Sequence, residues 1–144
     1  MFDEHNQQAL RQMYFLAWQK HENKALLNDL EQQIVSVMLE HPEYHHVLNN
    51  PEKFIEKTYH ATDGETNPFL HMGLHLGLRE QLATNRPMGI INVYQKLCGT
   101  LSEHDTQHEM MACLAETLFQ AQRNNGMPDD ETYLSLLKQR LYSK

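Results

Sequence analysis

Apolar residues recur along most of this chain at intervals of three and four positions. Near the start, Leu10, Met13, Tyr14, Ala17 and Trp18 follow the 3.6-residue period of an amphipathic helix. No stretch of the sequence alternates apolar and polar positions over six or more residues, so the pattern gives no signal for a half-buried β-strand. The chain is therefore predicted to be all-α.

Capping residues and prolines divide this pattern into segments. Asn28 or Asp29 begins a helix that ends at His41-Pro42, because the residue before a proline avoids the helical conformation. Further helices are expected to begin at Pro42, Pro68, Pro87, Ser102 or Asp105, and Pro128-Asp129-Asp130. Residues 51–67 are the least regular part, with Thr62-Asp63-Gly64 marking a turn. These segments predict a single-domain helical bundle of about five to seven helices over residues 1–144.

The segment from Phe69 to Leu78 is apolar on every side except where His71 and His75 stand. A helix that is apolar all round is normally buried by neighbours on all sides, and this one is too short to span a membrane. We therefore predict a central buried helix near residues 68–82. Gly73 and Gly77 lower its helix propensity, which suggests that a neighbouring backbone comes close there.

Histidine is the most unusual feature of the composition, with 10 residues among 144. That content gives by chance roughly 0.7 pairs at the i,i+4 spacing that places two side chains on one helical face. The sequence contains three such pairs, which are His41/His45, His71/His75 and His104/His108. Pro42 places His41 at a helix boundary, which weakens the first pair.

The other two pairs are predicted to face inward. His71 and His75 share a face with leucines, and His104 and His108 share a face with Met111. Ala115 and Leu118 extend that second face, whereas Glu109, Cys113 and Glu116 are expected on the opposite side. Neutral imidazole is a good ligand for transition metals, and coordination would satisfy buried ring nitrogens.

The metal hypothesis assigns four ligands to one ion. They are His71, His75, His104 and His108, with His41 or His45 able to replace one of them. The ion would be a transition metal such as zinc or iron, and Glu109 is the first candidate for an acidic group beside it. Four histidines would make the metal structural, whereas three would leave a position for an activated water.

A metal-free interpretation stands beside this one. Buried histidines often bond to backbone carbonyls or tyrosines, and Tyr59 and Tyr94 are available donors. The protein would then be an interaction or structural module with a buried hydrogen-bond network. A bis-histidine haem protein is a third class. No nucleophile elbow or phosphate-binding loop occurs in the sequence, which therefore identifies neither a reaction nor a small-molecule substrate.

Charge and cysteine content narrow the choice of partners and compartment. The formal net charge of −7 argues against sequence-independent binding to nucleic acid or to an anionic membrane surface. No apolar run approaches the ~20 residues of a membrane span, and the polar N-terminus does not resemble a signal peptide. The two cysteines, Cys98 and Cys113, are expected to be reduced thiols in a cytoplasmic protein. A homo-oligomer is compatible with the sequence, which leaves the oligomeric state open.

Several short motifs resemble a bacterial family of uncharacterised small helical proteins, domain-of-unknown-function family 1841. They are His41-Pro42-Glu43-Tyr44-His45, Asn67-Pro68-Phe69-Leu70-His71, His75, Glu80-Gln81, Arg86-Pro87, Gly89-Ile90, His104, His108-Glu109, Cys113-Leu114, Glu116 and Gln120-Ala121-Gln122-Arg123-Asn124. The resemblance covers roughly residues 35–140. It implies a family and a helical fold, and it implies no activity.

Overall fold

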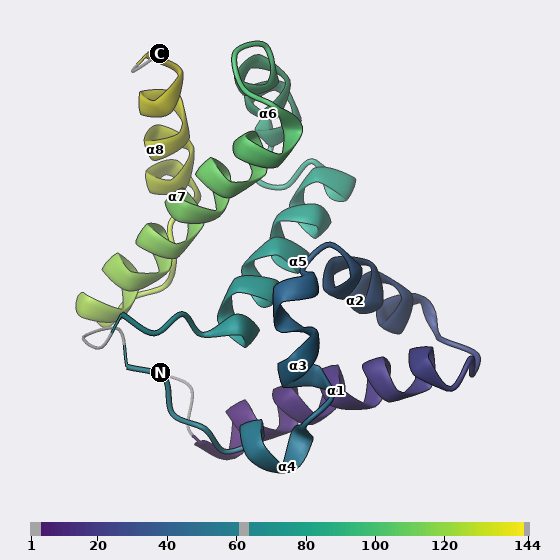
Figure 1. The fold of residues 1–144 in the computed structure, drawn as a ribbon. Helices are drawn as coiled ribbons and strands as arrows, with labels where there is room; N and C mark the ends of the chain where they lie inside the picture. Colours follow the sequence, from purple (N-terminus) through teal and green to yellow (C-terminus); the bar gives the residue numbers. More distant parts are fainter. Residues whose placement is uncertain (1–3, 61–63, 143–144) are drawn as a thin grey trace. The chain divides into compact units, whose positions relative to one another are not determined.

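The computed structural model describes residues 4–60 and 64–142, with side chains from residue 7 onward, and it confirms the all-α class. The described residues form eight α-helices and one 3-10 helix (Figure 1). This number slightly exceeds the prediction, because residues 42–54 fold into several short helices. Thr62 and Asp63 of the predicted turn lie outside the described residues. The chain divides into two compact units, residues 1–76 and 77–144.

The first unit is built around a helical hairpin. It contains α1 (Glu4–Glu22), α2 (Asp29–Leu39), η1 (Pro42–Tyr44), α3 (His45–Leu48), α4 (Pro51–Phe54) and the beginning of α5 (Pro68–Thr84). α1 packs against both α2 and α3 (Figure 1). The predicted start of α2 is confirmed: Asn28 caps the helix by accepting from the Glu31 backbone N–H, and the Glu31 carboxylate accepts from the Asn28 N–H.

The core of the first unit joins α1, α2, the short helices and α5. Its buried residues are Tyr14, Phe15, Ala17, Trp18, Ile34, Val35, Val37, Met38, Val47, Leu48, Phe54, Phe69 and Met72. The predicted stripe of α1 is wrong at its beginning, because Leu10 is 45% exposed whereas Arg11 is only 6% exposed. The buried face of α1 is rotated toward Arg11 and Phe15, since the Arg11 guanidinium binds backbone carbonyls at the end of α4 and just after it.

Helix α5 buries one stripe rather than its whole circumference. Phe69, Met72, His75 and Leu78 are buried at intervals of three residues, whereas Leu70 is exposed. The residues from 71 to 79 are at least partly buried, so the expected central burial holds there and stops at Leu70. A Cβ at Gly73 would lie 3.5 Å from the Tyr14 hydroxyl, an ordinary contact with a side chain rather than a backbone.

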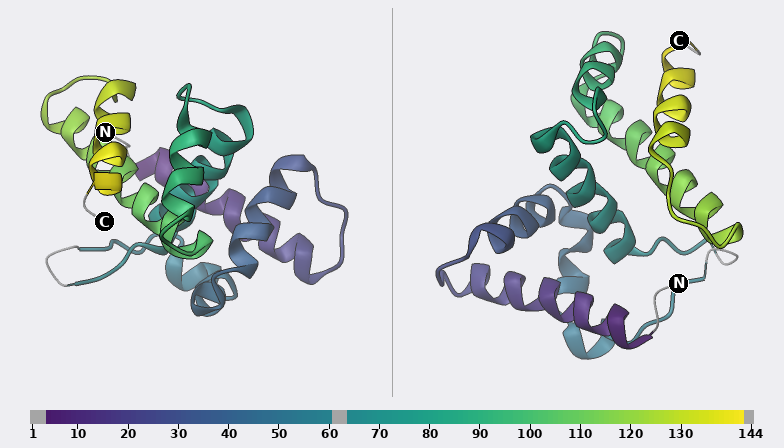
Figure 2. Two further views of the ribbon diagram at one scale, coloured as in Figure 1. Left: turned by 90° about the horizontal axis from the view of Figure 1, so that it is seen from above. Right: turned by 180° about the vertical axis from the view of Figure 1, so that it is seen from behind.

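The second unit is a small helical cluster. It contains the end of α5, α6 (Ile90–Cys98), α7 (Glu103–Arg123) and α8 (Asp130–Tyr142). α8 packs against α6 and α7, and it runs antiparallel to α7 (Figure 2). The predicted cap of α7 is confirmed, since the Ser102 hydroxyl accepts from the Asp105 N–H at 3.1 Å.

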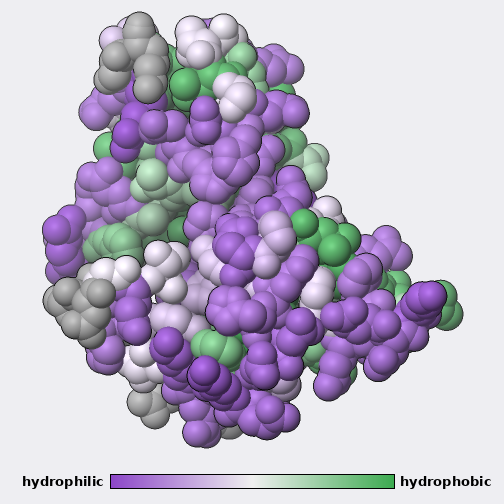
Figure 3. Space-filling model, viewed as in Figure 1, coloured by the Kyte–Doolittle hydropathy of each residue, from purple (hydrophilic) through white to green (hydrophobic). Residues whose placement is uncertain are grey.

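The surface seen in Figure 3 is mostly hydrophilic, with small apolar patches between the polar side chains. None of the described helices has both the length and the apolar character that crossing a lipid bilayer requires.

Candidate metal centre

Three histidines gather in the first unit, where the end of α2 meets α5. The ring centroid of His41 lies 4.9 Å from that of His71 and 5.2 Å from that of His75. His41 and His71 each offer a ring nitrogen, and these two nitrogens lie within 4.8 Å of each other. A tetrahedral ion with Zn–N bonds of 2.0–2.1 Å needs a separation of about 3.3 Å between two ligand nitrogens. The two rings must therefore turn toward each other to share one ion.

The orientation of His41 is fixed by the backbone of α2. Its side chain is only 3% exposed, and its Nδ1–H donates to the Val37 carbonyl oxygen at 2.8 Å. A carbonyl only accepts hydrogen bonds, so the proton of the neutral ring lies on Nδ1 and the lone pair lies on Nε2. Metal-binding histidines typically have this arrangement, with the second ring nitrogen bonded to a carbonyl. His41 therefore has the tautomer of a metal ligand.

Pro42 explains why His41 stands at this place. The proline prevents α2 from continuing, and His41 leaves the helix with φ −127° and ψ 65°. His71 and His75 lie one turn apart on α5. Two neighbouring ligands on one helix and a third from a helix end are a geometry that can surround one ion. His75 is buried and His71 is partly buried.

The aromatic ring of Tyr44 contacts the rings of two of these histidines. Its ring is parallel to that of His41, at 2° and a centroid distance of 5.6 Å. The same ring meets His71 edge-on at 5.9 Å. Burial, and next the neighbouring Glu43, raise the pKa of Tyr44 above its usual value.

His45, the other predicted replacement ligand, has a different environment. Its Nε2–H donates to the Met38 carbonyl oxygen at 2.8 Å, and its ring packs on Trp18 with centroids 4.5 Å apart. Of the two predicted replacements, His41 is therefore the one that lies beside His71 and His75.

His104 and His108 lie on α7, in the second unit. Their ring centroids are 4.2 Å apart, and Nδ1–H of His108 donates to the His104 carbonyl oxygen at 2.8 Å. His104 is exposed and His108 is partly exposed, so the prediction that His104 faces inward is wrong. The proposal that this pair shares one ion with His71 and His75 stays a prediction.

The first buried residue of α7 accounts for the exposure of His104. The buried residues of this helix are Thr106, Met110, Met111, Cys113 and Thr117, so Met111 is buried as expected. His104 stands two residues before Thr106 and therefore about 200° around the helix from it. Cys113, which was expected on the outer face, is fully buried.

Glu109, the predicted acidic group beside the metal, has a partner of its own. Its carboxylate accepts from Arg140 on α8 at 3.0 Å, and both side chains are partly exposed. Within the second unit, Glu109 therefore takes part in a surface ion pair between α7 and α8.

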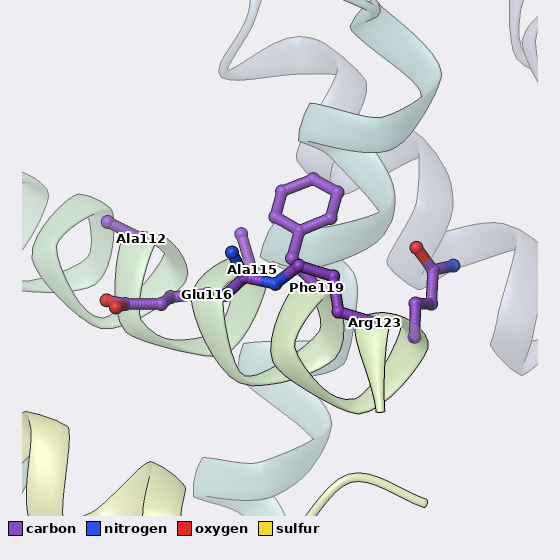
Figure 4. Close-up of a pocket in the computed structure, with 6 residues that line it drawn as sticks. Ala112, Ala115, Glu116, Phe119 and Arg123 are labelled. Carbon is purple, nitrogen blue, oxygen red and sulfur yellow. The ribbon is translucent and has the colours of Figure 1, made fainter. Parts of the chain in front are cut away.

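A shallow hollow lies on the surface of α7. All of its lining residues come from this helix, and five of them are labelled in Figure 4. They are Ala112, Ala115, Glu116, Phe119, Gln122 and Arg123. This lining is mainly apolar and contains no histidine or cysteine, so the hollow does not offer ligands for a transition metal.

Sequence reasoning underrated His41, which the structure places beside His71. Its local signal in the sequence is the following proline, which weakens a helical His41/His45 pair. A histidine at a proline-terminated helix end does not share a helical face with its i+4 partner. It can instead project toward another segment, as His41 does.

Comparison with known proteins gives a family and no activity. The family model described as "Domain of unknown function (DUF1841)" matches residues 6–139, so the chain belongs to this family. No curated protein and no solved structure matches the chain. The evidence for a function therefore comes from the residues themselves.

Proposed function

We propose that the first unit binds a transition-metal ion, zinc or iron, through His41 and His71, with His75 as a third ligand. The observation that carries this proposal is the proximity of the ring nitrogens of His41 and His71, within 4.8 Å, combined with the Nδ1–H bond of His41 to Val37. That hydrogen bond uses Nδ1, so it leaves the lone pair of His41 Nε2 available to an ion.

Three histidine ligands leave at least one coordination position for water or for another group. With water in that position, the ion would lower the pKa of the water toward neutrality and could supply a nucleophile. A fourth protein ligand would make the ion structural instead. The ligand set expected from sequence also contains His104 and His108, and His108→Ala tests that part of the prediction.

The test is the metal content of untagged protein, followed by titration of the metal-free protein with Zn²⁺ and Fe²⁺. We expect about one equivalent of bound metal in the wild type. His41→Asn places an amide nitrogen near the position of Nδ1, so it can keep the bond to Val37 while removing Nε2. His41→Asn and His71→Ala should each lower affinity at least about tenfold. His60→Ala, an exposed histidine of the same unit, is the control and should bind like the wild type.

Two results would contradict the proposal. One is less than about a tenth of an equivalent of any transition metal in the wild type, with no binding on titration. The other is wild-type affinity in both His41→Asn and His71→Ala. Because His104 and His108 are adjacent and accessible, they can bind ions by themselves, and only the binding that His41→Asn removes counts as support.

A second candidate is a metal-free structural module, and a specific observation favours it. His41 and His45 donate to the carbonyls of Val37 and Met38 in the last turn of α2, which also accept from the Glu40 and His41 backbone N–H groups. These rings then serve as side-chain caps. A chelator would leave the melting temperature of such a protein unchanged, whereas loss of a bound ion would lower it by several degrees.

We also infer that the protein works in the cytoplasm. Cys98 and Cys113 are both free thiols, as expected in a reducing compartment. The net charge of −7 disfavours binding to the phosphates of nucleic acid, so we infer partners of another kind. Redox labelling of both thiols in cell extracts tests the compartment, and an intermolecular disulfide in the native protein would contradict it.

A further inference from the structure

The separation between His41 and His71 is set by packing rather than by the local chain. The two histidines are 30 positions apart in the chain, and they belong to different elements. Each imidazole can also rotate about its terminal χ2 bond, whose energy wells are broad for histidine. Two nitrogens that must meet on one ion therefore need a group that restrains both rings.

Tyr44 is the aromatic residue that contacts both of them. Its ring lies parallel to His41, and parallel contact resists rotation of the His41 ring about χ2. Its edge-on contact with His71 restrains that second ring from a different direction. The hydrogen bond to the Val37 carbonyl restrains His41 alone, whereas the Tyr44 ring contacts both candidate ligands.

The position of Tyr44 in the chain supports this role. It is the last residue of η1, three positions after His41, and the Tyr44 N–H donates to the His41 carbonyl oxygen at 2.9 Å. The turn begun by Pro42 therefore places the phenol ring back over the imidazole. A flexible aliphatic side chain at the same place would fill space without providing a flat surface.

We propose that Tyr44 is a positioning residue of this metal site, whose ring keeps His41 and His71 beside each other and limits the directions in which their rings turn. The inference rests on the proposed metal-binding function. It assigns the effect to the aromatic ring and not to the hydroxyl group, because the contacts that carry it are ring contacts.

The experiment is a titration of the metal-free full-length chain with Co²⁺, which replaces Zn²⁺ and reports coordination geometry in its visible spectrum. Tyr44→Phe keeps the ring and should retain Co²⁺ affinity within about threefold, with an unchanged spectrum. Tyr44→Leu and Tyr44→Met should lower affinity at least about tenfold and alter the spectrum. Phe54→Leu is the matched control: Phe54 is a buried aromatic residue of the same unit that contacts His46 instead.

The outcomes separate this inference from the proposed function. Absence of any Co²⁺ signal that His41→Asn removes would overturn both. A signal that His41→Asn removes but that is unchanged in Tyr44→Leu and Tyr44→Met would overturn the role of Tyr44 alone. An equal loss in Tyr44→Phe would assign the effect to the hydroxyl group and also overturn it. An equal loss in Phe54→Leu would mean that general destabilisation, rather than positioning, weakens binding.

Discussion

The buried guanidinium of Arg11 is expected to be a major stabilising element of the first unit. Its Nη1 lies 3.1 Å from the Phe54 oxygen, 3.2 Å from the Ile55 oxygen and 2.6 Å from the Lys57 oxygen. It thereby ties the end of α4 and the following chain to α1. The guanidinium carbon also lies 4.8 Å from the centroid of the Phe69 ring, within range of a cation–π interaction.

Arg11→Lys keeps the charge and removes the planar group. A hydrogen bond from a charged donor contributes about 1.5–3 kcal/mol, and the two protons of Nη1 serve at most two good bonds at once. Lysine can be expected to recover one of them. Adding part of a cation–π interaction of about 0.5–1 kcal/mol, we expect the free energy of unfolding to fall by about 2–4 kcal/mol.

The assay is urea unfolding followed by far-UV circular dichroism, with the slopes of the variants compared before free energies are extracted. Arg140→Lys is the matched control, because Arg140 pairs with Glu109 at 3.0 Å while partly exposed. That exposed pair should contribute no more than about 1 kcal/mol. A loss below about 1 kcal/mol for Arg11→Lys, or a loss equal to that of Arg140→Lys, would refute the reasoning.

The remaining predictions concern the pH dependence of stability and the replacement of two glycines. The hydrogen bond from Lys20, and next that from the Asn28 N–H, lowers the pKa of Glu31. The ionised Glu31 carboxylate therefore stabilises the fold at pH values above the ordinary carboxyl pKa, and this stabilisation is lost as the pH falls through the lowered pKa. Glu31→Gln, which can keep the capping box, should reduce the change in melting temperature between about pH 5 and pH 3, and an unchanged profile would contradict this. Gly77→Ala should raise the free energy of unfolding by about 0.5–1 kcal/mol, because a Cβ there meets nothing within 4 Å among the described residues. Gly89→Ala should lower it instead, because Gly89 has φ +96°, and calorimetry showing the same sign for both would be inconsistent with the structure.

Features encoded by neighbouring residues were predictable from sequence. The caps at Asn28 and Ser102 and the break at Pro42 depend on side chains bonding to, or excluding, backbone groups only a few positions away. The phase of α7 was not predictable in the same way. Thr106, Cys113 and Thr117 are buried there, yet hydroxyl and thiol residues give little hydrophobic signal.

The candidate site was predictable only in part, for a related reason. The i,i+4 spacing on one helix predicted that His71 and His75 share a face, and both rings lie near that of His41. The approach of His41 depends on where the end of α2 packs against α5, which is a tertiary contact between distant segments. Periodicity within one helix carries no information about that contact. For the same reason the burial of Arg11 was not predictable from periodicity, since its hydrogen-bond partners lie more than 40 residues further along the chain.

The contact between Trp18 and His45 gives this chain an internal optical reporter. Trp18 is the only tryptophan in the sequence, and its indole N–H donates to Asn49 at 2.8 Å. Fluorescence emission therefore senses residues 1–76 selectively, whereas amide absorption averages over every helix. Recording both signals during one denaturation would reveal whether the two halves melt in a single step or in succession.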